Sequence, residues 1–141
     1  MPHTFEYPVM RYRVIDGDSV EIDCDMGFST YRTVSVRLMG IDAPERGTIA
    51  GKGVAGVVRR WVDSVSTTKY RLLWVSRELD KYGRSLGNFV DGEHPTESLV
   101  KYLLDEKLVR VYDGGKREAW GEDELKAIEE RAGKILESGD P

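Results

Sequence analysis

Apolar and polar residues alternate through the first third of this chain, and this period of two restricts the fold more than any other feature. The pattern occupies residues 9–15, 20–25 and 33–38, with Asp16-Gly17-Asp18 as a turn between the first two segments. Strict alternation is typical of strands whose sheet has one buried and one solvated face. The sequence therefore predicts three consecutive strands that form a meander.

A helical period follows the glycine-rich loop at residues 46–53. Apolar residues in the segment 54–65 recur three and four positions apart, which predicts one buried helix face. Two more strands are expected at 70–76 and 86–90, and two more helices around 99–104 and 125–136. The order β-β-β-α-β-β-α-α is that of a five-stranded OB-type barrel with three helices, an α+β fold, although other α+β layouts share it.

Length and composition fit one domain over residues 1–141, with a barrel core at about 9–136. The single Cys24 excludes an intramolecular disulfide. No basic start followed by an apolar run is present at the N-terminus, so we expect a cytoplasmic protein, or a secreted one if the chain is a mature form. No apolar stretch approaches the ~20 residues of a membrane span, so no membrane association is expected.

Two acidic motifs stand where the predicted strands end. Residues two apart in an extended segment point to one face, so Asp16 and Asp18 are placed to converge on a cation. The alternative is a plain hairpin turn, because Asp-Gly is a common turn pair. In Asp42-Ala43-Pro44-Glu45 the proline restrains the backbone and so fixes the two acids relative to each other; the alternative there is a solvated loop.

Together these motifs offer the oxygen ligands that hard divalent cations prefer. A zinc site is not expected, because His3, His94 and Cys24 are isolated from one another in the sequence. Arg37 in the third strand and Arg84 in the turn 80–84 add two guanidinium groups, which bind phosphate through paired hydrogen bonds. Surface arginines are common, so each arginine taken alone favours a structural role.

Three segments occur in a fixed order: Val14-Ile15-Asp16-Gly17-Asp18-Ser19-Val20, Val36-Arg37-Leu38-Met39-Gly40-Ile41-Asp42-Ala43-Pro44-Glu45 and Asp80-Lys81-Tyr82-Gly83-Arg84. As a set they resemble the staphylococcal (micrococcal) nuclease family, the thermonuclease-like proteins. The resemblance extends from about residue 9 to 136. It implies a five-stranded OB barrel with three helices, in agreement with the strand and helix pattern.

The resemblance also implies roles for individual residues. Asp18, Asp42 and the backbone carbonyl of Ala43 match calcium ligands, and Asp16 matches an acid that acts on the ion through water. Glu45 matches a general base. The resemblance further implies phosphate binding by Arg37 and Arg84, nucleotide contacts by Lys81 and Tyr82, and packing beside the base by Tyr112.

The sequence thus predicts a calcium-dependent endonuclease that hydrolyses DNA, RNA or both and leaves 3′-phosphate ends. We expect a monomer that prefers single strands. Two alternatives remain: a non-catalytic OB module that binds single-stranded nucleic acid through aromatic stacking and basic grooves, and a calcium-regulated interaction domain. A binding module needs none of the carboxylates Asp18, Asp42 and Glu45, all of which are present.

Overall fold

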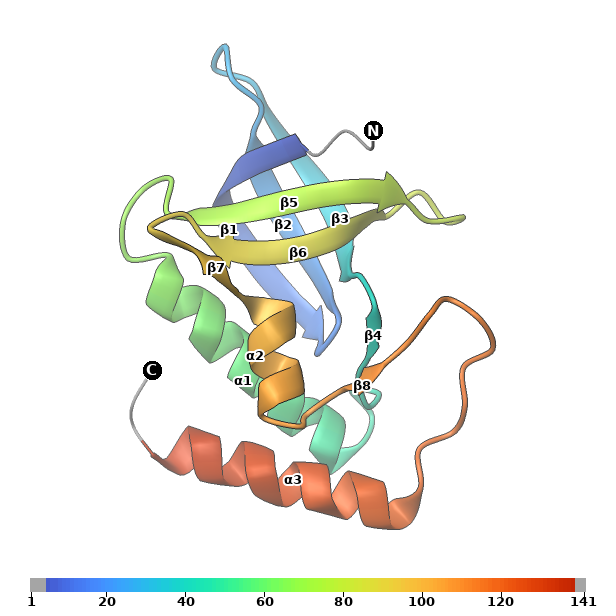
Figure 1. The fold of residues 1–141 in the computed structure, drawn as a ribbon. Coiled ribbons are helices and arrows are strands. Elements are labelled where there is room, and N and C mark those ends of the chain that lie inside the picture. Colours follow the sequence, from blue (N-terminus) through green and yellow to red (C-terminus); the bar gives the residue numbers. More distant parts are fainter. Residues whose placement is uncertain (1–4, 139–141) are drawn as a thin grey trace.

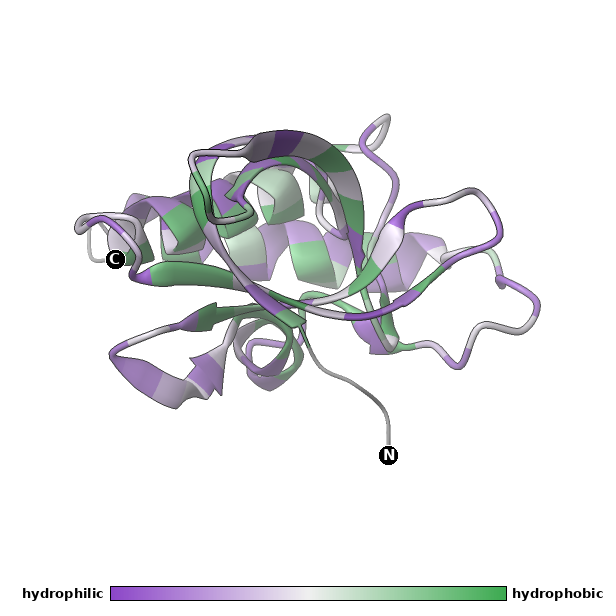
Figure 2. Ribbon diagram, turned by 90° about the horizontal axis from the view of Figure 1, so that it is seen from above, coloured by the Kyte–Doolittle hydropathy of each residue, from purple (hydrophilic) through white to green (hydrophobic). Residues whose placement is uncertain are grey.

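The N-terminal meander predicted from the alternation is present in the computed structural model, which describes residues 5–138. Strand β1 (Phe5–Asp16) pairs with β2 (Ser19–Asp25), and β2 pairs with β3 (Tyr31–Leu38), both antiparallel. The apolar residues that alternate along these strands point inward, and Figure 2 shows hydrophobic and hydrophilic residues alternating along the barrel strands. The period of two therefore marks the inner face of a barrel.

Two later strands close this barrel. Strand β5 (Leu72–Leu79) pairs with β1 and with β6 (Ser85–Asp91), both antiparallel. Strand β6 then pairs with β3 in parallel over three residue pairs, from Val36↔Ser85 to Leu38↔Gly87. The five strands β1, β2, β3, β6 and β5 form a closed ring, so the chain has the predicted α+β fold, an OB-like barrel with three helices.

The helices close one side of the barrel (Figure 1). Helix α1 (Ile49–Val65) buries the apolar face expected from its spacing, and it packs against both β1 and α3 (Glu122–Glu137). Helix α2 (Leu99–Asp105) is short and buries Leu99 and Leu103. None of the helices described for residues 5–138 is long and apolar enough to span a bilayer.

Three short strands were not predicted. Strand β4 (Ile41–Asp42) pairs with β8 (Arg110–Val111) in a separate two-stranded sheet. Within residues 5–138, strand β7 (His94–Ser98) pairs with β6 alone and so forms an edge of the sheet. Pro95 is tolerated there, because the free side of an edge strand has no neighbouring strand to which a backbone N–H would donate. The β4–β8 pairing matters for function, because it brings the segment around residue 110 to Asp42.

Candidate active site and nucleic-acid groove

Two acids and one arginine meet at the end of the barrel. Asp18 lies in the β1–β2 turn, Arg37 lies near the end of β3, and Asp42 ends β4. Nη2 of Arg37 lies 3.5 Å from Oδ2 of Asp18 and 4.0 Å from Oδ1 of Asp42. The three residues are 6%, 8% and 1% exposed, respectively. Two buried carboxylates therefore share one guanidinium, whereas the motifs predicted that they share a calcium ion and that Arg37 binds phosphate.

Close packing fixes the position of the Asp16-Gly17-Asp18 turn. A Cβ atom on Gly17 would lie 2.6 Å from Cγ1 of Val54 and 3.0 Å from Cβ of Ala43, so only glycine lets the turn approach α1 this closely. The backbone N–H of Ala43 then donates a 3.2 Å hydrogen bond to Oδ2 of Asp18. This contact joins the two acidic motifs directly.

Asp18 lies in an environment that does not fully compensate its charge. Burial raises the pKa of its carboxyl group above the usual value, and the charge of Asp42 acts in the same direction. The opposing influences, from Arg37, the Ala43 N–H and Arg117, are smaller in sum. More positive charge at this place would stabilise the ionised carboxylate, which suits a divalent cation.

Asp42 has two further arginine partners that the motifs did not indicate. Nη2 of Arg110 donates to its Oδ2 at 3.0 Å, and Nη2 of Arg117 donates to its Oδ1. Arg110 stands opposite Asp42 in the β4–β8 ladder. Both arginines belong to the segment 110–117, in which the sequence had drawn attention to Tyr112 alone, and the two-residue strands involved carry no local pattern that would reveal the pairing.

Tyr112 lies at this site against Arg37. The Cζ atom of Arg37 is 5.4 Å from the centroid of the Tyr112 ring, within the range of a cation–π interaction. The phenol donates a 2.5 Å hydrogen bond to the carbonyl of Gly115, and the backbone N–H of Tyr112 donates to the carbonyl of Gly40 at 2.8 Å. Tyr112 thus holds and covers Arg37; the contact with a base expected for it stays a prediction.

Glu45 occupies the rim of the cluster. Its side chain is exposed, whereas its carbonyl accepts hydrogen bonds from the Thr48 N–H (3.0 Å) and hydroxyl (2.7 Å). A Cβ on Gly51 would lie 1.8 Å from that carbonyl oxygen, so a glycine in the first turn of α1 allows the Glu45 loop to lie against the helix. The charge of Glu45 reaches the cluster, since it contributes to the raised pKa of Arg117.

The turn between β5 and β6 forms a second group of predicted residues. Asp80 accepts hydrogen bonds from the backbone N–H groups of Tyr82 and Arg84, both at 2.9 Å, and from Nε of Arg84 at 2.7 Å. Although burial opposes the change, these hydrogen bonds lower the pKa of Asp80. The cationic groups of Lys81 and Arg84 lie 5.3 Å and 5.7 Å from the centroid of the Tyr82 ring. Tyr82 itself is 73% exposed.

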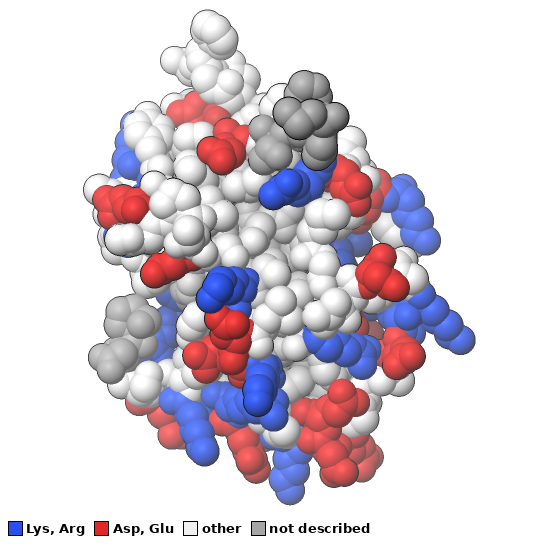
Figure 3. All heavy atoms as spheres, viewed as in Figure 1, with Lys and Arg blue, Asp and Glu red and all other residues white. Residues whose placement is uncertain are grey.

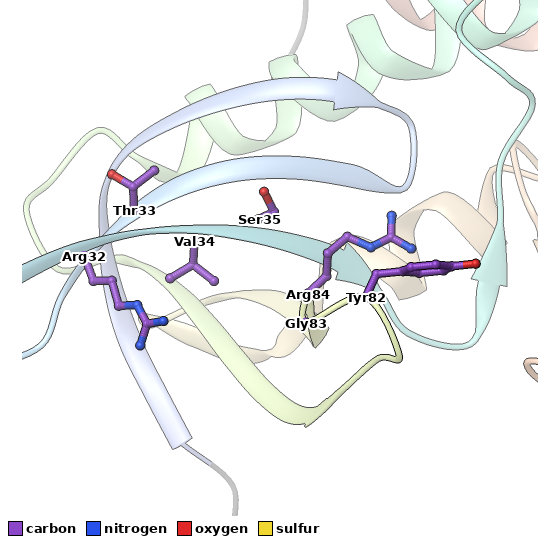
Figure 4. A pocket seen from close by; sticks show the side chains of 7 residues that line it. All are labelled: Arg32, Thr33, Val34, Ser35, Tyr82, Gly83 and Arg84. Carbon is purple, nitrogen blue, oxygen red and sulfur yellow. The ribbon is translucent and has the colours of Figure 1, made fainter.

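A groove lies between this turn and the exposed half of β3. It has a volume of about 620 Å³ and is lined by Arg32, Thr33, Val34, Ser35, Tyr82, Gly83 and Arg84 (Figure 4). Because β3 and β6 pair only from Val36 and Ser85 onward, the earlier part of β3 is left open beside the turn. The same pairing places Arg84 beside residue 35, two residues from Arg37, so the groove and the acidic cluster are neighbours.

The predicted calcium ligands are brought together only in part. Asp16 is half-buried at the end of β1, and within residues 5–138 no hydrogen bond or ion pair joins it to Asp18 or Asp42. Over the same residues no group of three or more His, Cys, Asp or Glu side chains is arranged to hold a metal. Asp18 and Asp42 supply the hard oxygen donors that calcium prefers. The residues fit the ion if one of the guanidinium groups on Asp42 moves aside.

The surface around these residues is not broadly basic. Figure 3 shows Lys and Arg mixed with Asp and Glu over the visible face, and the whole chain has a net charge of −4. Compared with known proteins, the chain matches no family model, and no curated protein matches it significantly. Function is therefore inferred from the geometry of the site and from the motifs.

Proposed function

We propose that the protein is a calcium-dependent phosphodiesterase that cuts DNA or RNA strands. One observation carries the proposal: Asp18 and Asp42, buried at the end of the barrel, both lie close to Nη2 of Arg37, at 3.5 Å and 4.0 Å. Burying two carboxylates and an arginine is unfavourable unless they are paired, and apolar residues in their place are often at least as stable, so a structural role alone does not require them. Such residues are typical of sites that handle charged substrates.

Each residue of the proposed site has a separate role in the reaction. Arg37 and Arg84 bind nonbridging oxygens of the phosphate and stabilise the charge that develops there. Glu45, exposed at the rim, orients or deprotonates the attacking water. Asp18 and Asp42, with the Ala43 carbonyl, would hold a calcium ion, which when bound would supply positive charge to polarise the phosphate. The bond between phosphorus and the 5′ oxygen then breaks, so that the 5′ oxygen leaves as a hydroxyl and the phosphate stays on the 3′ end, as the family resemblance implies.

The groove supports a single-stranded substrate. Arg32 and Arg84 carry positive charge on its walls, and the exposed Tyr82 offers a face for base stacking. Single-strand binding by OB barrels combines such cationic grooves with aromatic platforms, and stacking contributes about 1–3 kcal/mol per base. Lys81, beside the Tyr82 ring, adds a further cationic contact for the strand.

A cleavage assay tests the proposal. We expect the protein to degrade single-stranded DNA or RNA in calcium, much more slowly in magnesium, and not at all in chelator, because calcium accepts the irregular oxygen ligands that magnesium rejects. Asp42→Asn is expected to be inactive, and Asp123→Asn, in the first turn of α3, is the matched control that keeps full activity. Full activity in chelator, or an active Asp42→Asn variant, would contradict the calcium mechanism.

A second candidate is a non-catalytic module that binds single strands. It is favoured by one feature: both oxygens of Asp42 already accept hydrogen bonds from arginines, so the acid is stably paired as it stands. In this case the same oligonucleotides would bind in fluorescence anisotropy, and no product would form in any metal. We favour the enzyme, because a binding groove does not need the buried Asp18–Arg37–Asp42 cluster.

A further inference from the structure

The two additional arginines on Asp42 are held in different ways. The Cζ atom of Arg110 lies 3.9 Å from the Trp120 ring centroid, and the Nη2 atom that binds Asp42 also donates to the carbonyl of Glu118. Arg110 also belongs to β8, which is paired with β4. An arginine fixed by a strand, a ring and two acceptors has a defined position and keeps Asp42 oriented.

Arg117 is held much less firmly. Its side chain is 50% exposed, and the only hydrogen bond found for it within residues 5–138 goes to Oδ1 of Asp42. It belongs to the segment 112–121, which contains no helix or strand and includes Gly114 with φ +91°. Figure 1 shows this segment as a wide loop that projects between β8 and α3. Arg117 therefore reaches back to Asp42 from a loop whose backbone is held beside it at the Glu118 carbonyl, whereas its own exposed side chain has Asp42 as its hydrogen-bond partner.

The guanidinium of Arg117 lies where a cation would be expected. Although burial opposes the change, the hydrogen bond to Asp42 and the charges of Asp42, Asp18 and Glu45 raise the pKa of Arg117. These three acids are the ones assigned above to calcium and to the attacking water. Arg117 thus adds its charge to those of Arg37 and Arg110 beside these carboxylates in the cation-free protein.

We propose that Arg117 is a third substrate-binding arginine that occupies the cation's place until calcium binds. When the ion takes Oδ1 of Asp42, Arg117 is released and binds the phosphate of the nucleic-acid strand, while Arg110 stays in place and keeps Asp42 oriented. This inference rests on the proposed function, because it assigns a role in the same site.

Charge and linkage give the reason for the exchange. A divalent ion and a guanidinium on one carboxylate repel each other, so each weakens the binding of the other to Asp42. Such coupling is reciprocal: if Arg117 opposes calcium, removing Arg117 must tighten calcium binding. Once released, the guanidinium can pair with the negative charge of a phosphate bound beside Asp42.

Calcium titration of the intact chain by isothermal titration calorimetry tests whether Arg117 competes with calcium for Asp42. We expect Arg117→Gln to bind calcium about tenfold more tightly than the wild type, a factor within the usual range of coupling between sites. Arg59→Gln, on the exposed side of α1, is the matched control and should leave calcium affinity unchanged. A variant that merely loses a structural contact would bind calcium equally or more weakly, so the direction of the change is diagnostic.

A second experiment tests whether the released Arg117 binds the strand. It follows the binding of a cleavage-resistant phosphorothioate oligothymidylate by fluorescence anisotropy in saturating calcium. Arg117→Gln is expected to bind it about tenfold more weakly than wild type, as loss of one phosphate contact requires, with a shallower salt dependence. In chelator, where Arg117 remains on Asp42, the two proteins should bind the oligonucleotide equally. Melting curves confirm that each variant is folded.

The outcomes separate this inference from the proposed function. Tighter calcium binding with weaker oligonucleotide binding supports it, as does calcium binding by Arg117→Gln when the wild type binds none. Unchanged or weaker calcium binding by Arg117→Gln, with a wild type that binds calcium, overturns the inference and leaves the calcium-dependent site intact. Absence of calcium binding in the wild type and in Arg117→Gln alike overturns both.

Discussion

Replacing Asp18 by asparagine should stabilise the cation-free protein while removing the calcium site. The amide oxygen can still accept the 3.2 Å hydrogen bond from the Ala43 N–H, but the buried negative charge is gone. Because burial raises the pKa of Asp18, the ionised carboxylate is less favourable in the folded chain than in the unfolded one. At neutral pH that penalty is fully present, so Asp18→Asn should increase the free energy of unfolding.

The size of the change follows from the neighbours of Asp18. Arg37 at 3.5 Å offsets part of the burial penalty, so only the remainder is recovered. Replacing one unfavourable group in this way typically increases the free energy of unfolding by about 1 kcal/mol. For a chain of this length that corresponds to a rise in melting temperature of roughly 3 °C.

Calcium should reverse the order of stability. An ion that binds only the folded wild type stabilises it by about 2.7 kcal/mol at a concentration one hundred times its dissociation constant. Asp18→Asn lacks a ligand and should gain much less. Thermal denaturation at pH 7 in chelator and in calcium measures both effects, with Asp123→Asn as the exposed control. The variant should melt above the wild type in chelator and below it in calcium.

The pH dependence has a definite sign. The pKa of Asp18 in the folded chain exceeds its usual value of 3.8. The free energy of unfolding therefore decreases as the pH rises from 3.8 through the folded pKa. The difference between Asp18→Asn and wild type in chelator should therefore shrink as the pH falls, and it should vanish below 3.8, where wild-type Asp18 becomes protonated in the unfolded chain as well as in the folded one. A variant that melts below the wild type in chelator at pH 7 would show that the ion pair with Arg37 outweighs burial, and the reasoning would be wrong.

Three further outcomes concern catalysis. Arg37→Lys and Arg84→Lys should each lose about a hundredfold in turnover, because a point charge cannot reproduce a two-pronged guanidinium contact; near-full rates in the folded variants would remove them from the phosphate clamp. Glu45→Gln should keep its oligonucleotide binding in anisotropy and cleave far more slowly in gels, whereas loss of both would assign Glu45 to holding the site together. End analysis of a labelled oligonucleotide should find 3′-phosphate and 5′-hydroxyl products, and 5′-phosphates would indicate a different mechanism.

The barrel was predictable because its signal is local. Alternation along residues 9–15, 20–25 and 33–38 reports which side chains face inward, and the helical spacing of 54–65 reports the buried face of α1. Strand β7 was not predicted, because Pro95 favours a break and the strand has no buried face of its own. Its existence depends on an unpaired edge of β6, which is a property of the assembled sheet.

The candidate site was predictable only in part. Local motifs identified Asp18, Arg37 and Asp42, whereas Arg110 and Arg117 lie 68 and 75 residues beyond Asp42 in the chain. Arg37 was expected on a solvated strand face, but Tyr112 and the two acids leave it 8% exposed. Such burial is created by a loop folding over the strand end, and alternation within β3 carries no information about that loop.

The distance in sequence between Asp42 and its arginines also has a consequence for a chain that is still being made. A ribosome-bound chain that ends before residue 110 contains the acids of the cluster but neither Arg110 nor Arg117, and the parallel seam between β3 and β6 cannot form until Ser85–Gly87 have emerged. Contacts this far apart form late, because the loop between them must close first. The paired cluster around Asp42 therefore cannot be complete until at least residue 117 of the chain has been synthesised.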